Sequence, residues 1–168
     1  MNKDDGTYLR GTRPPPMLPF RSEKGRKRII VASSPTFGNW TLMAKRLEAY
    51  TDGVRDPILL IGSFHQKGDK LAADWFGYYW YLYRIYHLNT EKHKDRAEFV
   101  RNIEMIKQAD MLIAFHNGNP HPPLDHLIRV AKLRELEVHV VKYKPKAWIR
   151  VTKIKKPKFK IRIRRHGD

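Results

Sequence analysis

The sequence contains no cysteine among its 168 residues. Disulfides and thiolate metal sites are therefore excluded, and nothing in the composition argues for export. No apolar run reaches the length of a membrane span, and the polar start MNKDDGTYLR lacks the apolar core of a signal peptide. These absences predict a soluble protein that works in the cytoplasm.

Acidic residues are scarce, with 17 Asp and Glu against 34 Lys and Arg, which gives a net charge of +17. The excess is concentrated at the two ends. Residues 1–28 hold 8 basic and 3 acidic residues, and residues 142–168 hold 12 basic and 1 acidic residue, whereas residues 29–141 are nearly neutral. Charge placed in this way indicates basic arms that meet nucleic acid or an acidic protein surface, or else two solvated tails.

Short apolar runs alternate with helical patterns through the middle of the chain. The runs RIIVAS, PILLIG, YRIYHL, DMLIAF and EVHVVKY are expected strands, and amphipathic segments separate them. This order predicts an α/β fold, a Rossmann-like doubly wound sheet of five parallel strands. We expect seven strand residues to be buried: Ile30, Val31, Leu59, Leu60, Leu112, Ile113 and Val140. Asn39 is the expected cap of the first helix.

The chain divides into a proline-rich basic arm over residues 1–27, a domain over residues 28–143 and a basic arm over residues 144–168. Four prolines in GTRPPPMLPFRSEKGRKR predict an extended or polyproline-like N-terminal arm. Aromatic residues crowd positions 75–83, in WFGYYWYLY. Their place at a helix end that runs into a strand favours packing in a core or interface over the stacking of bases.

The C-terminal arm alternates apolar and basic residues in PKFKIRIRR. Such alternation is typical of a strand with one apolar and one cationic face, and AWIRVTKI could pair with it as a hairpin. An arm that becomes ordered only on a partner is the alternative. We expect the cations of this arm to bind a polyanion such as nucleic acid: Lys158, Lys160, Arg162, Arg164 and Arg165.

The turn GSFHQKGD, which follows the second expected strand, contains more glycine than a simple turn needs. Gly62 and Ser63 would let a ligand approach the backbone, and Gly68 and Asp69 would start and cap the next helix. In a parallel sheet, this turn lies at the same edge as ASSPTFGN and FHNGNPHPP, where ligands of such folds bind. An aspartate there suits a ribose hydroxyl or a helix cap, and a plain capped turn explains the spacing about as well.

Taken in order, the segments RIIVASS, GSFHQKGDKLA and RNIEMIKQADMLIAFHNG resemble the SLOG superfamily, in particular its YspA/YpsA-related branch. The resemblance covers residues 28–143. It implies a cleft for a nucleotide or ADP-ribose-like ligand, with no other cofactor indicated, and it suits a bacterial or phage protein. The site residues that it implies, together with those of the three turns, are Ser33, Ser34, Gly62, Ser63, Gly68, Asp69, Arg101, Asn102, Asn117 and Gly118.

The chain departs from the family at two of its turns. Ala32, Ser33 and Ser34 stand where the family has Gly-Ser-Arg, and Pro122-Pro123 replaces Gly-Thr, which removes two N–H donors from a presumed phosphate site. In the related LOG phosphoribohydrolases a glutamate follows this turn; here His126 stands in its place. We therefore expect ligand binding rather than hydrolysis, and name no catalytic residue.

Two functions remain open at this level. The first is a nucleotide-binding or nucleotide-sensing domain, and the second is a nucleic-acid-binding or assembly protein that uses the fold as a scaffold. His116, His121 and His126 recur at intervals of five, which does not place them on one helical face, so no metal site is expected. The sequence leaves the oligomeric state open, a homo-oligomer included.

Overall fold

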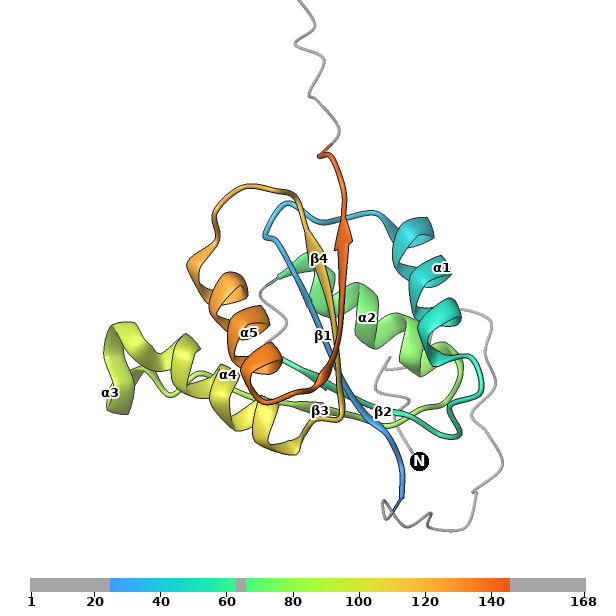
Figure 1. Cartoon of the computed structure of the whole chain (residues 1–168), viewed down its shortest axis with the longest axis horizontal. Helices are drawn as coiled ribbons and strands as arrows, with labels where there is room; N and C mark the ends of the chain where they lie inside the picture. The colour runs from blue at the N-terminus through green and yellow to red at the C-terminus, as the bar shows by residue number, and fades with distance from the viewer. Residues whose placement is uncertain (1–24, 63–65, 146–168) are drawn as a thin grey trace, which may run out of the picture.

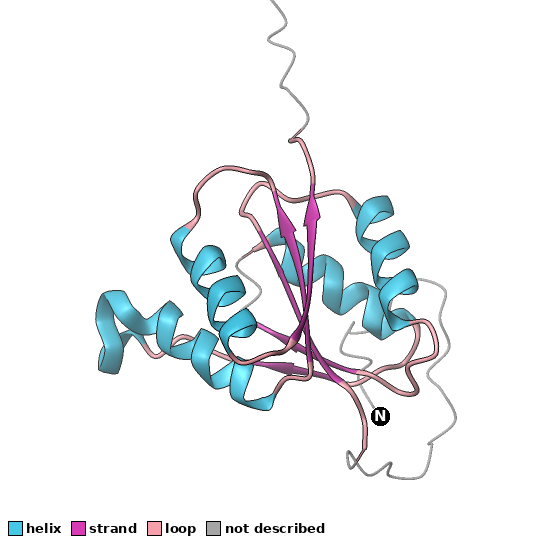
Figure 2. Cartoon of the chain, in the orientation of Figure 1, coloured by secondary structure: helices cyan, strands magenta, loops and turns pink. Residues whose placement is uncertain are grey.

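Figures 1 and 2 show the computed structural model, which describes residues 25–62 and 66–145. Strands and helices alternate along these residues. In chain order they are β1 (Arg28–Ser33), α1 (Trp40–Thr51), β2 (Ile58–Ile61), α2 (Lys67–Tyr78), β3 (Tyr83–Ile85), α3 (Thr90–His93), the 3₁₀ helix η1 (Lys94–Arg96), α4 (Ala97–Gln108), β4 (Met111–His116), α5 (Pro122–Leu133) and β5 (Glu137–Lys142).

The strands form one sheet in the order β3-β2-β1-β4-β5, and every neighbouring pair is parallel. The predicted doubly wound, Rossmann-like α/β fold is therefore confirmed. Because β1 is central, the chain first builds outward through β2 and β3 and then crosses to the other side with β4. Ile30 of β1 pairs with Leu60 of β2 on one side and with Leu112 of β4 on the other.

Helices cover both faces of the sheet (Figure 1). On one face, Met43 and Leu47 of α1 and Phe76 of α2 pack against odd-numbered β1 residues such as Val31. On the other face, α4 and α5 pack against Ile30 and its neighbours. The two-residue period of a strand thus divides the core into two layers, and the continuous apolar runs reflect burial on both faces.

One of the predicted core positions is wrong. Val140 is 36% exposed, whereas Val141 beside it is buried. β5 is an edge strand, and Val140 lies beside α5 in an open groove, whereas Val141 points into the layer under α1. The other six predicted residues are fully or almost fully buried.

The aromatic residues after position 74 divide between the core and the surface. Trp75 and Phe76 are buried, as the packing interpretation predicts, but Tyr78, Tyr79 and Trp80 are 40–56% exposed. Helix α2 ends with bonds from Trp80 N to Gly77 O and from Tyr81 N to Phe76 O. In this type of helix end glycine usually takes the left-handed position, which Trp80 occupies here at φ +59°.

Several expectations concern residues outside the described ranges. These are the conformations of both arms, the polyanion-binding row Lys158, Lys160, Arg162, Arg164 and Arg165, and the position of Ser63. Among the described residues, none of the helices has the length and apolar character needed to cross a membrane. The short helix α3 and the turn η1, which precede α4, were not predicted.

Candidate ligand-binding site

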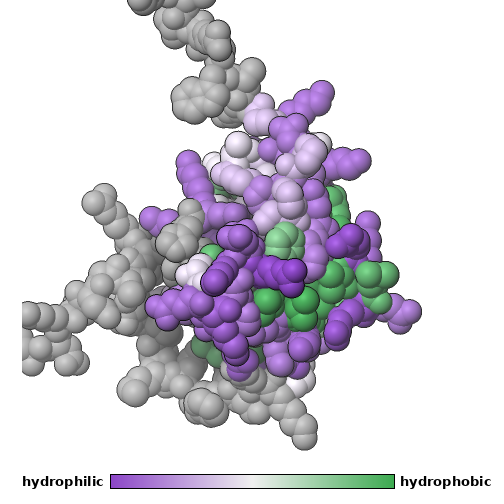
Figure 3. All heavy atoms as spheres, turned by 90° about the vertical axis from the view of Figure 1, so that its left-hand side faces the viewer, coloured by the Kyte–Doolittle hydropathy of each residue, from purple (hydrophilic) through white to green (hydrophobic). Residues whose placement is uncertain are grey.

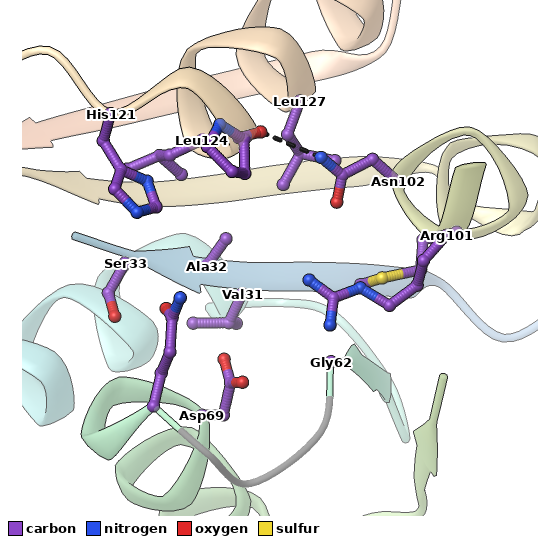
Figure 4. Close-up of a pocket in the computed structure, with 13 residues that line it drawn as sticks. Val31, Ala32, Ser33, Gly62, Asp69, Arg101, Asn102, His121, Leu124 and Leu127 are labelled. Atoms are coloured by element: carbon purple, nitrogen blue, oxygen red, sulfur yellow. Dashed lines mark hydrogen bonds between the residues drawn. The ribbon is translucent and has the colours of Figure 1, made fainter. Parts of the chain in front are cut away.

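A small cleft lies where β1 and β2 end and the helices α2, α4 and α5 come together (Figure 4). It encloses about 40 Å³, which is room for a few water molecules. Its polar lining comes from four segments: Ser33, Gln66, Asp69, Arg101, Asn102 and His121. The cleft therefore lies at the carboxyl edge of the sheet, where ligands of this fold class bind.

Gly62, after β2, and Gly68, in the first turn of α2, both lie close to side chains of the protein itself. A Cβ on Gly68 would overlap the Ser33 hydroxyl and would lie 2.7 Å from the Ser33 Cβ. A Cβ on Gly62 would lie 2.9 Å from a terminal nitrogen of Arg101. The groups that come close to the backbone at these two glycines are therefore the Ser33 side chain and the Arg101 guanidinium.

Ser33 is the last residue of β1, and its side chain is buried against the start of α2. Only 3% of the residue is exposed, yet its hydroxyl has no hydrogen-bond partner within the part of the chain that the structure describes. A buried hydroxyl without a partner costs free energy, roughly 1–3 kcal/mol. Its position in the cleft lining makes it available to a bound polar group.

Asp69 does not cap α2, contrary to expectation. Gln66 occupies the N-cap position and its side chain makes no capping bond, while Asp69 is the third helical residue. The carboxyl is 7% exposed, and burial raises its pKa to about 7, although the Arg101 guanidinium acts in the opposite direction. Near neutral pH this carboxyl is thus present in both protonation states, so it can either donate or accept a hydrogen bond.

Arg101 enters the cleft from the first half of α4. Figure 4 shows its guanidinium and the Asp69 carboxyl reaching into the same space from different walls. The buried Nε of Arg101 has no hydrogen-bond partner among the described residues. Its charge therefore faces the cleft with unused donor capacity, as a site for an anionic group would require.

Asn102, the neighbour of Arg101, has a structural role. It is 3% exposed, and its amide donates to the Pro123 carbonyl at 2.8 Å, which joins α4 to the start of α5. Because Pro122 and Pro123 have no N–H, the beginning of α5 has few donors of its own. This hydrogen bond holds the two helices together along one side of the cleft.

A carboxylate of the protein already occupies the N-terminus of α5. Asp125 accepts a hydrogen bond from His121 N at 2.9 Å and is paired with His116 Nε2 at 2.8 Å. Its pKa is lowered, first by the bond with His116 and then by the one with His121. A phosphate at this helix end would meet that negative charge, which disfavours the phosphate position that the resemblance to the SLOG superfamily implies.

Three of the predicted site residues belong to the neighbouring turns and not to the cleft lining. The Ser34 hydroxyl accepts from Asn117 N at 3.1 Å, and the Asn117 amide donates to Thr36 at 3.1 Å. Gly118 has φ +86° and donates its N–H to His116 Nδ1 at 2.9 Å. These contacts tie the β1–α1 turn to the β4–α5 turn.

Some features of the site were missed at the level of the sequence. Gln66 and His121 line the cleft, and the only signal in the sequence that could have indicated them is their position just before two helices.

Other side chains near these turns pack against aromatic rings. Phe37, from the turn after β1, is fully buried, with its ring 4.6 Å from that of Phe115. His126 packs edge-on against Phe99 at 4.9 Å, and no cluster suited to a metal ion is found in the described ranges.

Five parallel strands with helices on both faces define a Rossmann-like α/β domain, and the cleft at its carboxyl edge combines a buried carboxyl with an arginine. Comparison of the chain with protein-family models, with curated proteins and with solved structures found no match.

Proposed function

We propose that the chain is a SLOG-like domain that binds a nucleotide or a nucleotide derivative at this cleft. The observation that carries the proposal is the convergence of unsatisfied polar groups. The Ser33 hydroxyl and the Arg101 Nε are buried without partners among the described residues, and the raised pKa of Asp69 reports a buried carboxyl beside them. Two unpartnered groups and a buried carboxyl in one small space are costly to the fold, and a polar ligand could bond to them.

Each group suits one part of such a ligand. Arg101 matches a phosphate, which it can bind with two parallel hydrogen bonds. Asp69, which can donate or accept, matches a ribose hydroxyl. Since Asp125 already fills the α5 N-terminus, the phosphate is assigned to Arg101 and the side of the cleft formed by β2 and α2.

The size of the cleft limits which part of the ligand is enclosed. About 40 Å³ accommodates a hydroxyl-bearing edge of a sugar or a few phosphate oxygens, but not a whole nucleotide. We therefore assign the cleft to the sugar-phosphate part and place the base toward the open side. Discrimination between bases at this cleft should then be weak, because the base would lie outside the cleft.

Binding without hydrolysis is the form of the proposal that the local geometry favours. The LOG-type reaction requires a carboxylate after the β4 turn, and His126 stands there, turned against Phe99. Desolvation, followed by the charge of Arg129, lowers the pKa of this histidine. A neutral imidazole packed on a phenyl ring does not replace a carboxylate that stabilises an oxocarbenium-like centre.

The proposal is tested by thermal shift and calorimetry on the full-length protein. The panel of ligands contains nucleoside mono-, di- and triphosphates, NAD and ADP-ribose. Arg101→Ala should weaken the best ligand by roughly 1.5–3 kcal/mol, the range of a hydrogen bond to a charged group. Arg129→Ala is the matched control, because Arg129 lies outside the cleft on α5. If no compound in the panel shifts the melting temperature, the nucleotide proposal fails.

A second candidate function is the binding of a polyanion along α5 and β5. An open groove of about 640 Å³ lies there, and Arg129, Lys132 and Lys142 line it, with Lys142 at the end of the strand that leads into the basic C-terminal arm. Figure 3 shows the side that carries α3, α4 and α5, where apolar side chains gather among hydrophilic ones. The charge of the arm thus continues onto the folded domain.

Titration with labelled single-stranded DNA and RNA at two salt concentrations tests this second candidate. We expect an affinity that is nearly independent of sequence and falls steeply with salt. Charge reversal at Lys132 and Lys142 should weaken binding and reduce the salt slope by about one for each phosphate that the variant no longer neutralises. Unchanged affinity in that variant would remove the folded domain from the interaction.

A further inference from the structure

The end of α2 and the edge strand β3 present an aromatic surface, which we define as Tyr78, Tyr79, Trp80, Leu82 and Tyr83. Each of these side chains is between 40% and 56% exposed. Contiguous exposed apolar surface on a small domain usually marks a contact site. We propose that this aromatic surface binds the chain's own proline-rich segment, Pro14 to Phe20.

The backbone is arranged so that Trp80 belongs to this surface. Trp80 occupies the left-handed position at the end of α2, with φ +59°, where glycine is the favoured residue. Its N–H is bonded to the Gly77 carbonyl, so the conformation is well defined. A bulky indole at a position that disfavours it indicates that the ring itself has a use.

The rings around Trp80 are ordered with respect to one another. Tyr79 lies 4.8 Å from Trp75, 5.1 Å from Tyr78 and 5.8 Å from Tyr81, measured between ring centroids. Trp75 is buried and anchors this set to the core. The surface therefore contains rings packed against one another, and aromatic side chains of this kind bind proline-rich segments in the polyproline II conformation.

The described chain begins close to the aromatic surface. Arg28 pairs with Ile58 and Leu59 pairs with Tyr83, so the beginning of β1 is level with the beginning of β3. Only β2 separates these two strands, which corresponds to roughly 10 Å across the sheet. The aromatic surface therefore lies at the end of the sheet where the described chain begins.

The residues just before β1 contact the start of β2. The Lys27 carbonyl accepts from Ile58 N at 2.9 Å, and Arg26 donates from Nε to the Asp56 carbonyl at 2.7 Å. The Lys27 side chain pairs on the other side with Glu137 of β5 at 2.6 Å. Gly25 follows Pro19 by six residue steps, which at the rise of about 3.1 Å per residue in polyproline II would span roughly 19 Å.

The composition of the segment fits the surface. RPPPMLPF contains four prolines, a methionine, a leucine and a phenylalanine within eight residues. A proline-rich segment loses little conformational entropy on binding, because its extended form is largely preset. Proline rings and aromatic faces pack well, and tyrosine hydroxyls such as those of Tyr78 and Tyr79 can donate to the carbonyls of a proline-rich segment.

The absence of cysteine permits a direct test in the full-length chain. Met17→Cys is combined with Tyr78→Cys and treated with a short bismaleimide, and the product is followed by intact mass and by gel mobility. Met17→Cys with Leu133→Cys is the matched control, because Leu133 is also exposed but lies at the end of α5 on the other face. We expect intramolecular cross-linking to be at least about tenfold faster in the first pair.

A second variant separates binding of the proline-rich segment to the aromatic surface from the proximity that follows simply because both belong to one chain. Changing Pro14, Pro15, Pro16 and Pro19 to serine in the 17/78 pair keeps the length and charge of the arm but removes its polyproline character. The cross-linking rate should then fall to that of the control pair. Equal rates in the 17/78 and 17/133 pairs, or an unchanged rate in the serine variant, would overturn the proposal, and a cross-linked dimer would transfer the segment to a second copy of the chain.

Discussion

Replacement of Gly68 by alanine tests the packing that holds α2 against β1. The new methyl group would overlap the Ser33 hydroxyl and would lie 2.7 Å from its Cβ, and both contacts are closer than real Cβ atoms permit. Ser33 ends a central strand and is buried, so it cannot simply swing into solvent. Relief requires a rotation of the Ser33 side chain together with a displacement of α2.

Overpacking of this kind typically costs about 1–3 kcal/mol. Gly68 does not have a positive φ, so alanine also gains about 0.4–1 kcal/mol through the lower entropy of the unfolded chain. We expect a net loss of about 1–2 kcal/mol in the free energy of unfolding. Urea denaturation followed by circular dichroism measures it, and an unchanged slope would show that the unfolded state is the same.

Gly77→Ala is the matched control because Gly77 lies in the same helix, with no atom within 4 Å of the Cβ position. Alanine there should leave stability unchanged or raise it by about 0.5–1 kcal/mol. If Gly68→Ala is as stable as Gly77→Ala, then Ser33 does not pack against α2 as described, and the geometry of the cleft is wrong.

Two further predictions concern buried and paired carboxyls. The folded-state pKa of Asp69 is raised from 3.8 to about 7. The loss of folding free energy caused by ionising this buried carboxyl is therefore absent below about pH 4 and grows as the pH rises to about 7. Asp69→Asn should abolish that decline and stabilise the protein at pH 8 by on the order of 2–4 kcal/mol in urea titrations, and a parallel pH profile for the two proteins would contradict it. Asp125 has a lowered pKa, so its contribution is present at neutral pH and is lost as pH falls through the folded-state value. Asp125→Ala should cost about 0.5–1 kcal/mol at pH 7, because the Asp125 side chain is 45% exposed, and less at pH 3. An equal cost at both pH values would mean that the carboxylate does not hold the α5 terminus.

The fold could be predicted from the sequence because its signals are local. RIIVAS predicts a strand whose bounds agree with β1, since a β-branched run of that length is typical of burial on both faces. Asn39 caps α1 as predicted, with its side chain accepting from Leu42 N at 3.0 Å. The predicted burial of Val140 was wrong because successive residues of a strand point to opposite faces of the sheet. The pattern EVHVVKY does not show which face of this edge strand α5 leaves open, so it does not show that Val140 is exposed and Val141 is buried.

The candidate site could be predicted only in part because its contacts join distant segments. The extra glycines were noticed, but their cause is Ser33 and Arg101, 35 and 39 residues from the glycines they meet. No local signal distinguishes an aspartate that caps a helix from one that is buried beside an arginine of another helix. The carboxylate that fills the α5 terminus likewise depends on two histidines brought together by the β4–α5 turn.

The assignment of the cleft to a nucleotide is best tested by calorimetric titration of the wild-type protein, Arg101→Ala and Arg129→Ala. The ligand is the nucleotide that gives the largest thermal shift. We expect Arg101→Ala to weaken binding by about 10- to 150-fold, the equivalent of roughly 1.5–3 kcal/mol, and Arg129→Ala to bind as the wild type does. A ligand whose affinity falls in Arg129→Ala and stays unchanged in Arg101→Ala would place its site on the α5–β5 groove and contradict the assignment of the cleft.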